Sequence, residues 1–349
     1  MTVHRKSLLV GSIPAADTDD AVRCAMDEMG SLLIAVPDGE TGERKAWVGA
    51  IIDRLSSNPA FQLKKAGRWT GYDDVPEYRV RRRMRVDPDS LALGYYDAFQ
   101  LSRPVIEAAA STRDLVGLPL QVGVVSAFDL TLFSQGWTGA LRHRGPFNVA
   151  TAREIAAIRS ERAGDVIFQI EIPAELVAVA RSPRLIRPAV ARWMGRMAVE
   201  LTRSVSPGTR FGIHLCYGDL GNHSFITGLR DCAAAVALTN AIVASWPSTV
   251  SLEYVHLPLA AGDEPPSLDA TYYAPLSDLR LPPLTRLVAG FVHEGLSEDQ
   301  LRDVLILVES ARHGRVDIAA ACGLGRREPN VARTIMKRTR ILCEAPRPA

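Results

Sequence analysis

The chain has 349 residues, of which 47% are hydrophobic and 23% are charged, and its formal net charge is +2. This composition is typical of a globular protein that can bury a sizeable core. The nearly neutral charge gives no reason to expect nucleic acid or an anionic membrane as a partner. No stretch reaches the roughly 18 consecutive apolar residues that a membrane span needs.

The five cysteines are spread along the chain without the spacing of a disulfide framework. Their odd number and wide spacing favour a reducing compartment. Two basic residues precede an apolar run near the N-terminus, but this run over residues 7–13 is only about as long as a strand, too short for a signal peptide. We therefore expect a cytoplasmic protein.

Short apolar runs rich in β-branched residues alternate with segments of helical periodicity along the chain. Most of the runs are continuously apolar, which is typical of strands buried on both faces of a parallel sheet. The predicted strands cover residues 7–13, 31–37, 119–127, 165–173, 209–217, 249–257, 286–293 and 315–323. The predicted helices cover residues 16–30, 43–56, 89–110, 151–163, 187–205, 229–246, 297–312 and 328–343.

Strands that alternate with helices in this number are typical of a (β/α)8 barrel. We therefore expect an α/β fold, a single (β/α)8 TIM barrel that forms one domain over residues 1–349. A long excursion over residues 37–119 separates the second and third strands, and we expect it to be an elaborated loop over the barrel mouth. A shorter insertion over residues 218–228 follows the fifth strand.

Functional residues of such a barrel project from the carboxyl ends of its strands. Polar or ionisable residues occupy most of these positions, more often than chance placement would give. They are Ser12, Glu40, Ser126 with Asp129, Glu171, His214 with Cys216, Glu253, His293 and Cys322. The carboxyl end of the barrel is therefore the predicted site.

Four of these residues have the chemistry of metal ligands. His214 and Cys216 are two residues apart on a predicted strand, so both side chains point to the same face. One imidazole, two thiolates and one carboxylate would make a mononuclear zinc site, which exchanges one ligand for substrate when it is catalytic. The residues of these types are His214, Cys216, Cys322 and Glu253. Such a site predicts a zinc-bound thiol as the nucleophile.

Several short strings occur in the order found in the catalytic barrel of cobalamin-independent methionine synthase. They are GSIP (11–14), DGE (38–40), FQIEIPAEL (168–176), HLCYGD (214–219), LEYVH (252–256) and CGLG (322–325). The chain resembles this family over nearly its whole length, within the superfamily that also contains uroporphyrinogen decarboxylase. The resemblance implies a TIM barrel with zinc-dependent methyltransferase activity on a thiol.

The resemblance also implies roles for single residues. Zinc would be held by His214, Cys216, Glu253 and Cys322. The amino-acid part of a homocysteine-like thiol would be bound by Gly11, Ser12, Glu40 and Glu171. His293 resembles the histidine that is thought to donate a proton to the leaving group in this family.

The chain departs from the family pattern in two places. The family's Asp-Glu-Pro reads Glu171-Ile172-Pro173 here, so one carboxylate is kept and the next is lost. The insertion over residues 218–228 lengthens the distance between Cys216 and Glu253. The resemblance therefore supports zinc–thiol chemistry, but it does not specify methionine as the product.

We expect a zinc-dependent alkyltransferase, most simply a methyltransferase, that activates a small-molecule thiol for attack on an alkyl donor. The donor stays open among a folate, a corrinoid protein and a small molecule. One alternative is a metal-free decarboxylase or lyase of the uroporphyrinogen decarboxylase class, in which arginines would hold substrate carboxylates. The other is a non-catalytic zinc- or thiol-binding protein that uses the same ligands.

Overall fold

The computed structural model describes residues 5–162 and 164–346. Its main sheet has seven parallel strands in the order β1-β4-β5-β6-β7-β8-β9. They are β1 (Val36–Pro37), β4 (Leu120–Val125), β5 (Val166–Glu171), β6 (Arg210–His214), β7 (Ser251–Pro258), β8 (Arg286–Val292) and β9 (Asp317–Ala320). Each of these strands falls inside a predicted strand, except that β7 extends one residue further. The agreement arises because continuously apolar runs are typical of buried parallel strands.

The first predicted strand forms isolated bridges instead of a continuous strand. Ser7 is bridged in parallel both to Leu33, just before β1, and to Ile318 in β9. The Ser7 N–H donates to the Leu32 carbonyl at 2.8 Å, and the Leu8 N–H donates to the Ile318 carbonyl at 3.2 Å. The segment at Ser7 therefore joins the two edges of a curled sheet, an arrangement consistent with a TIM-barrel-like fold.

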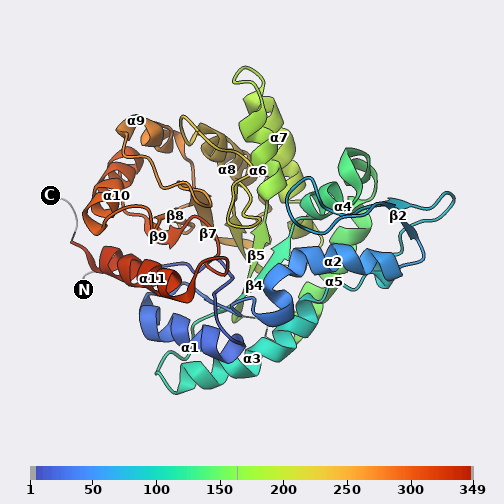
Figure 1. Ribbon diagram of the computed structural model, residues 1–349, viewed down its shortest axis with the longest axis horizontal. Coiled ribbons are helices and arrows are strands. Elements are labelled where there is room, and N and C mark those ends of the chain that lie inside the picture. The colour runs from blue at the N-terminus through green and yellow to red at the C-terminus, as the bar shows by residue number, and fades with distance from the viewer. Residues whose placement is uncertain (1–4, 163, 347–349) are drawn as a thin grey trace.

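Helices surround this sheet on the outside (Figure 1). They are α1 (Thr18–Met29), α2 (Trp47–Arg54), α3 (Tyr95–Ser111), α4 (Ala127–Arg142), α5 (Arg144–Glu161), α6 (Pro173–Arg181), α7 (Arg187–Ala198), α8 (Ala233–Ser245), α9 (Ala270–Tyr273), α10 (Glu298–Arg312) and α11 (Pro329–Glu344). Within residues 5–162 and 164–346, none of the helices combines the length and the apolar character needed to cross a membrane.

Side chains at the helix starts explain why the helices begin where they do. The Asp17 carboxylate accepts from the backbone of Asp20 at the start of α1. Ser297 and Gln300 form a reciprocal capping box at the start of α10. Ser126 caps α4 directly after β4. The last residue of the predicted strand over 119–127 therefore belongs to a helix that was not predicted.

The space enclosed by the curled sheet holds both an apolar cluster and a polar layer. The apolar cluster consists of Leu8, Ala35, Ile167, Tyr254, Val288 and Ala319. Gly212 makes room for Tyr254, because a Cβ at this glycine would lie 2.1 Å from the tyrosine ring. The Tyr254 hydroxyl donates to Gln169 at 2.9 Å, and Gln169 donates to the Glu171 carboxylate, also at 2.9 Å. These hydrogen bonds orient the Glu171 carboxyl from the interior of the sheet.

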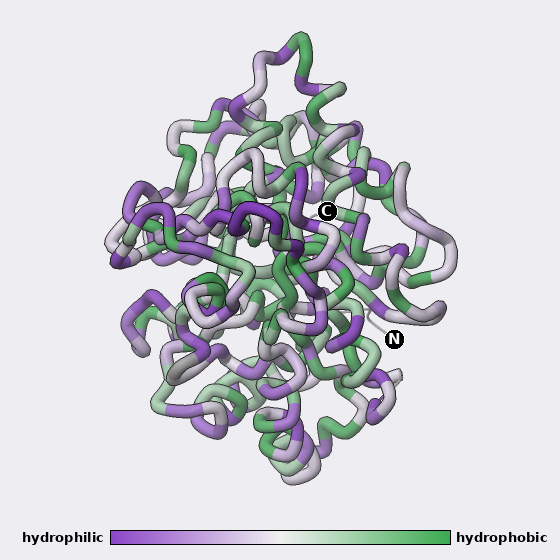
Figure 2. Tube along the Cα trace, turned by 90° about the vertical axis from the view of Figure 1, so that its right-hand side faces the viewer, coloured by the Kyte–Doolittle hydropathy of each residue, from purple (hydrophilic) through white to green (hydrophobic). Residues whose placement is uncertain are grey.

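The excursion between β1 and β4, predicted to be a loop, contains a β-hairpin. Its strands are β2 (Phe61–Lys65) and β3 (Glu77–Val80), which pair antiparallel. The hairpin projects from the body of the molecule on the right of Figure 1. Figure 2 shows the whole molecule from the side on which the hairpin projects. Hydrophilic segments of the chain lie along much of the outside, and hydrophobic segments gather in the middle of the view.

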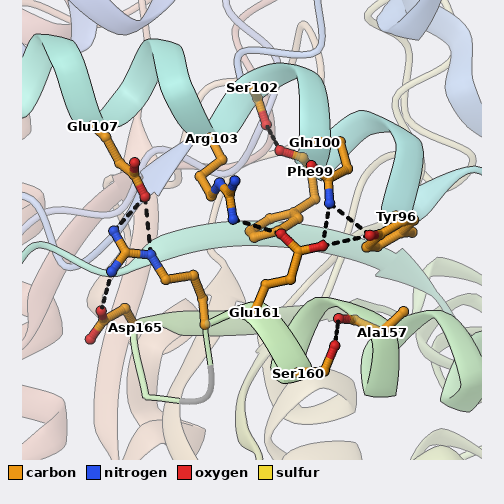
Figure 3. Close-up of polar contacts among 11 residues, drawn as sticks. Tyr96, Phe99, Gln100, Ser102, Arg103, Glu107, Ala157, Ser160, Glu161 and Asp165 are labelled. Carbon is orange, nitrogen blue, oxygen red and sulfur yellow. Dashed lines mark hydrogen bonds and ion pairs between the residues drawn. The ribbon is translucent and has the colours of Figure 1, made fainter.

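The helical end of the excursion is fixed to α5. The buried Glu154 carboxylate accepts N–H groups from the four consecutive residues 93–96 and so satisfies the open amino end of α3. Figure 3 shows the α3 side chains Tyr96, Gln100 and Arg103 converging on the Glu161 carboxylate. Because these contacts fix α3 to the barrel, the excursion is part of the same packed body.

Candidate functional site

Three predicted ligands lie together at the carboxyl ends of two strands. His214 is the last residue of β6, Cys216 follows two residues later, and Cys322 follows β9. Their donor atoms all lie within 4.8 Å of one another. The two sulfur atoms are 3.6 Å apart, and Cys322 Sγ is 3.7 Å from His214 Nε2. No other group of this kind occurs among the residues that the structure describes.

A second histidine fixes the orientation of the His214 ring. His256 Nε2 lies 2.9 Å from the Ala320 carbonyl, and His256 Nδ1 lies 2.9 Å from His214 Nδ1. Burial lowers the pKa of His256 to about 4 and, together with the neighbouring imidazole, holds the pKa of His214 well below its ordinary value. Both rings are therefore neutral at pH 7.

The hydrogen-bond chain determines which nitrogen carries each proton. A carbonyl can only accept, so His256 Nε2 is the donor and His256 Nδ1 must accept from His214 Nδ1. This leaves an unprotonated Nε2 on His214, facing Cys322. Metal-binding histidines are commonly oriented in this way through the nitrogen that does not bind the metal. Gly290 leaves space for the His256 ring, because a Cβ at this position would lie 2.4 Å from His256 Nε2.

We expect His256→Phe to lower zinc affinity about 10- to 100-fold, the usual effect of removing a residue that orients a ligand. The phenyl ring cannot accept the His214 Nδ1–H, which is fully buried. His256→Gln keeps an acceptor and should retain more of the affinity. Competition with a chromophoric chelator measures both variants, and equal affinities for His256→Phe and the wild type would contradict the orienting role.

A cavity of ≈ 400 Å³ opens beside the two thiols. Cys216, Cys322 and the predicted residues Gly11, Ser12, Glu40 and Glu171 contribute to its wall. Its acidic residues are Glu40, Asp53, Asp129, Glu171 and Asp219, whereas its basic residues are Lys45 and Arg326. Carboxyl groups therefore outnumber cations around the cavity.

Glu40 and Glu171 face each other inside the cavity. A Cβ at Gly123 would lie 3.6 Å from Glu171 Oε1 and 3.8 Å from Glu40 Oε1. Burial, reinforced by the charge of Glu171, raises the pKa of Glu40 to about 8. Burial also raises the pKa of Glu171 to about 7, against the effect of the hydrogen bond from Gln169. A cationic group placed between the two carboxyls would favour their charged forms.

Gly11 and Ser12 shape the same wall in different ways. A Cβ at Gly11 would lie 2.5 Å from Glu40 Oε1, so only glycine lets the carboxyl take this position. The Ser12 hydroxyl accepts the Gly325 N–H at 3.1 Å, and its carbonyl accepts the Leu324 N–H at 2.7 Å. Ser12 thus holds the loop that carries Cys322.

The structure does not bring the expected fourth ligand, Glu253, to the two thiols. Glu253 is the third residue of β7 and forms a two-pronged ion pair with Arg210, at 3.0 and 3.1 Å. In the register of the sheet, His214 pairs with His256, three residues further along β7. The register shifts at Glu253, which falls between the paired residues Leu252 and Tyr254, and its carboxylate is held by Arg210. The predicted strand over residues 249–257 already placed Glu253 four residues before its end, so its inclusion among the strand-end residues did not follow from the predicted strand.

We expect Glu253→Gln to leave the zinc content unchanged. The ion pair with Arg210 is about one quarter exposed on both sides, so its loss should cost at most about 1 kcal/mol of stability. Zinc analysis and thermal unfolding measure the two effects. Loss of zinc in this variant would show that Glu253 reaches the metal.

His293 also lies away from its expected place. The ring is buried, its Nδ1 accepts the Gly295 N–H at 2.9 Å, and its Nε2 donates to the Gly262 carbonyl at 3.0 Å. It does not belong to the residues that line the cavity. Since both nitrogens bind loop backbone, the expected proton donor serves here to fix two loops.

Two insertions meet over the cavity. The Tyr72 hydroxyl, from the excursion, accepts the Leu220 N–H at 3.0 Å and donates to the His223 carbonyl at 3.1 Å. Its ring packs edge-on against Phe225 with the centroids 4.7 Å apart. Tyr72 and Trp69 both line the cavity. The excursion and the insertion over residues 218–228 therefore form a common roof.

Sequence reasoning missed several residues of the site. Asp219 and Arg326 line the cavity, and His256 supports His214. Asp219 and Arg326 lie within three or four residues of a predicted ligand, Cys216 or Cys322, which was the one available signal. His256 lies at the end of β7 beside His214, and only the sheet register reveals this proximity.

No protein-family model matches the chain, and no curated protein matches it significantly in sequence. Among solved structures, it is similar to a B12-independent methionine synthase from Shewanella sp. W3-18-1 in complex with selenomethionine. That match has a TM-score of 0.60 and 13% identity, and it covers 98% of this chain and 97% of that one. A methyltransferase from Methanosarcina mazei matches with a TM-score of 0.52 and 12% identity, over 97% of this chain and 94% of that one. At these identities, the likeness establishes a shared fold.

Proposed function

We propose that this protein is a zinc-dependent alkyltransferase, most simply a methyltransferase, that acts on a small-molecule thiol. The observation that carries the proposal is the group of His214, Cys216 and Cys322, whose donor atoms lie within 4.8 Å of one another beside a cavity. A cavity of ≈ 400 Å³ is of the size that holds a small molecule.

The donor set fits zinc. Imidazole nitrogen and thiolate sulfur are its preferred ligands, and His214 already presents an unprotonated nitrogen to the two sulfurs. His214, Cys216 and Cys322 would hold the ion. Zinc, when bound, would lower the pKa of an incoming thiol while leaving the thiolate nucleophilic. The roof formed by Tyr72 and the insertion over residues 218–228 would exclude water from this thiolate.

The acidic pair supports an amino-acid thiol as the substrate. Glu40 and Glu171 could bind an ammonium group, and the pKa of each, about 8 and about 7, would fall when they do. A structural neighbour was solved with selenomethionine, an amino acid with selenium in place of sulfur. A homocysteine-like thiol combines the ammonium group with the sulfur in one molecule.

The fold supports the same function. The bridges of Ser7 to Leu33 and Ile318 are those expected if a closed (β/α)8 barrel forms a single domain. Two solved structures that share the fold are those of a methionine synthase and a methyltransferase. By contrast, the excess of carboxyl groups in the cavity does not suit a decarboxylase whose arginines hold substrate carboxylates.

The decisive experiment combines zinc analysis with X-ray absorption. Protein purified without added metal should contain about one zinc per chain, with two sulfur neighbours. A panel of thiols, with homocysteine and a thiol that lacks the amino group, should raise the sulfur count to three only for substrates. Absence of stoichiometric zinc would refute the proposal. Zinc whose sulfur count responds to none of the thiols would favour a non-catalytic metal-binding protein.

A further inference from the structure

Asp219 is a buried carboxylate that lines the cavity with Cys216 and Cys322, outside the group of donor atoms that lie within 4.8 Å of one another, so it would have to move towards a bound metal. It follows Cys216 by three residues and lines the same cavity, and it is 7% exposed. One oxygen, Oδ2, pairs with Arg326 Nη1 at 2.6 Å. The other oxygen, Oδ1, is buried and has no hydrogen-bond partner among the described residues.

An acceptor oxygen without a partner is costly inside a protein. Metal ligands are deprotonated, so two thiolates and one carboxylate would share this small buried volume. Arg326 neutralises one of these charges from the Oδ2 side. A divalent cation among the sulfurs would neutralise the others.

We propose that Asp219 is the fourth protein ligand of the zinc, through Oδ1, and that it is the ligand which gives way to the substrate thiol. This inference depends on the proposed function, because it assumes the zinc held by His214, Cys216 and Cys322. Carboxylate oxygen is an accepted zinc ligand, and ligating carboxylates are usually held by a further hydrogen bond, as Arg326 holds Oδ2.

The ion pair with Arg326 explains why Asp219 can be exchanged. Oxygen is a harder donor than the two sulfurs and the imidazole, so it competes least well with an incoming thiolate. After exchange, the carboxylate keeps its contact with Arg326 and is not left as an isolated buried charge. Arg326 is thus a positioning residue for Asp219.

Introducing a sulfur at this position tests the inference without relying on activity. In zinc-loaded Asp219→Cys, X-ray absorption should find three sulfur neighbours where the wild type has two. Leu220→Cys is the matched control, because Leu220 is the next residue and also lines the cavity. It should keep two sulfur neighbours. A count of two in Asp219→Cys would overturn the assignment.

A second variant covers the case in which Asp219→Cys does not fold. Asp219→Asn keeps the shape of the side chain and, because it removes the charge of a proposed ligand, should lower zinc affinity by chelator competition at least as much as the roughly 10- to 100-fold loss caused by removing a residue that orients a ligand. Unchanged affinity in this variant would also overturn the assignment. The outcome is distinct from failure of the proposed function, in which the wild type itself would hold no zinc on Cys216 and Cys322.

Discussion

Cys322→Ser is expected to strip zinc from the protein and abolish alkyl transfer. The thiol lies 3.6 Å from Cys216 Sγ and 3.7 Å from His214 Nε2, so it occupies one corner of the proposed ligand group. A serine hydroxyl does not ionise near pH 7 and is a poor zinc ligand. The loss of affinity should exceed the roughly 10- to 100-fold effect of removing a supporting residue such as His256.

His214→Ala and Cys216→Ser should give the same result, because each removes one of the remaining donors. Cys24→Ser is the matched control, since this cysteine lies half-buried in α1 and outside the ligand group. It should retain one zinc per chain. Metal analysis after gel filtration, with circular dichroism to confirm folding, measures the set. Full zinc content in any of the three ligand variants would remove that residue from the site.

Glu40→Gln is expected to make the protein more stable at alkaline pH. The pKa of Glu40 is raised from 4.5 to about 8 in the folded chain, chiefly by burial. Between these two values the folded state binds more protons than the unfolded state, so stability falls as the pH rises. Glutamine resembles the protonated carboxyl and removes this loss.

The variant should match the wild type below about pH 4, where Glu40 is protonated in both the folded and the unfolded state. At pH 8 it should gain on the order of 4 kcal/mol from this shift, which corresponds to several degrees in Tm. Some dependence on pH should persist up to about 7, because Glu171 keeps its own raised pKa. Thermal unfolding across this range provides the measurement, with Glu77→Gln, a surface ion-pair partner of Lys64, as control. A wild type whose Tm does not fall between pH 5 and 8 would contradict the raised pKa.

The sequence predicted the parallel strands well because their apolar runs follow a simple rule of burial. It failed where a strand passes directly into a helix, as at Ser126, because the apolar run continues across the junction while the backbone changes. It also missed the β2–β3 hairpin, whose strands are mostly exposed and so lack a continuous apolar run. Local periodicity cannot distinguish such segments from loops.

The site was predictable in part for a similar reason. His214 ends β6 and Cys216 follows two residues later, and Cys322 stands before a glycine just after β9, so the local sequence pattern was sufficient to select them. The predicted strand over residues 249–257 was itself a reason to reject Glu253 as a strand-end residue, whereas the direction of its side chain depends on the register shift between β6 and β7. The role of His256 depends on the same register and on the empty space at Gly290.

The contact of Tyr72 with Leu220 and His223 joins two segments that are inserted between elements of the barrel. Cys216 and Cys322 each follow a strand of the main sheet by two residues, whereas the residues that form the Tyr72 contact lie in the two inserted segments. Loops tolerate changes of length and sequence far better than a packed sheet does. Substitutions around Tyr72 could therefore change which small molecule enters the cavity without disturbing His214, Cys216 and Cys322 beneath it.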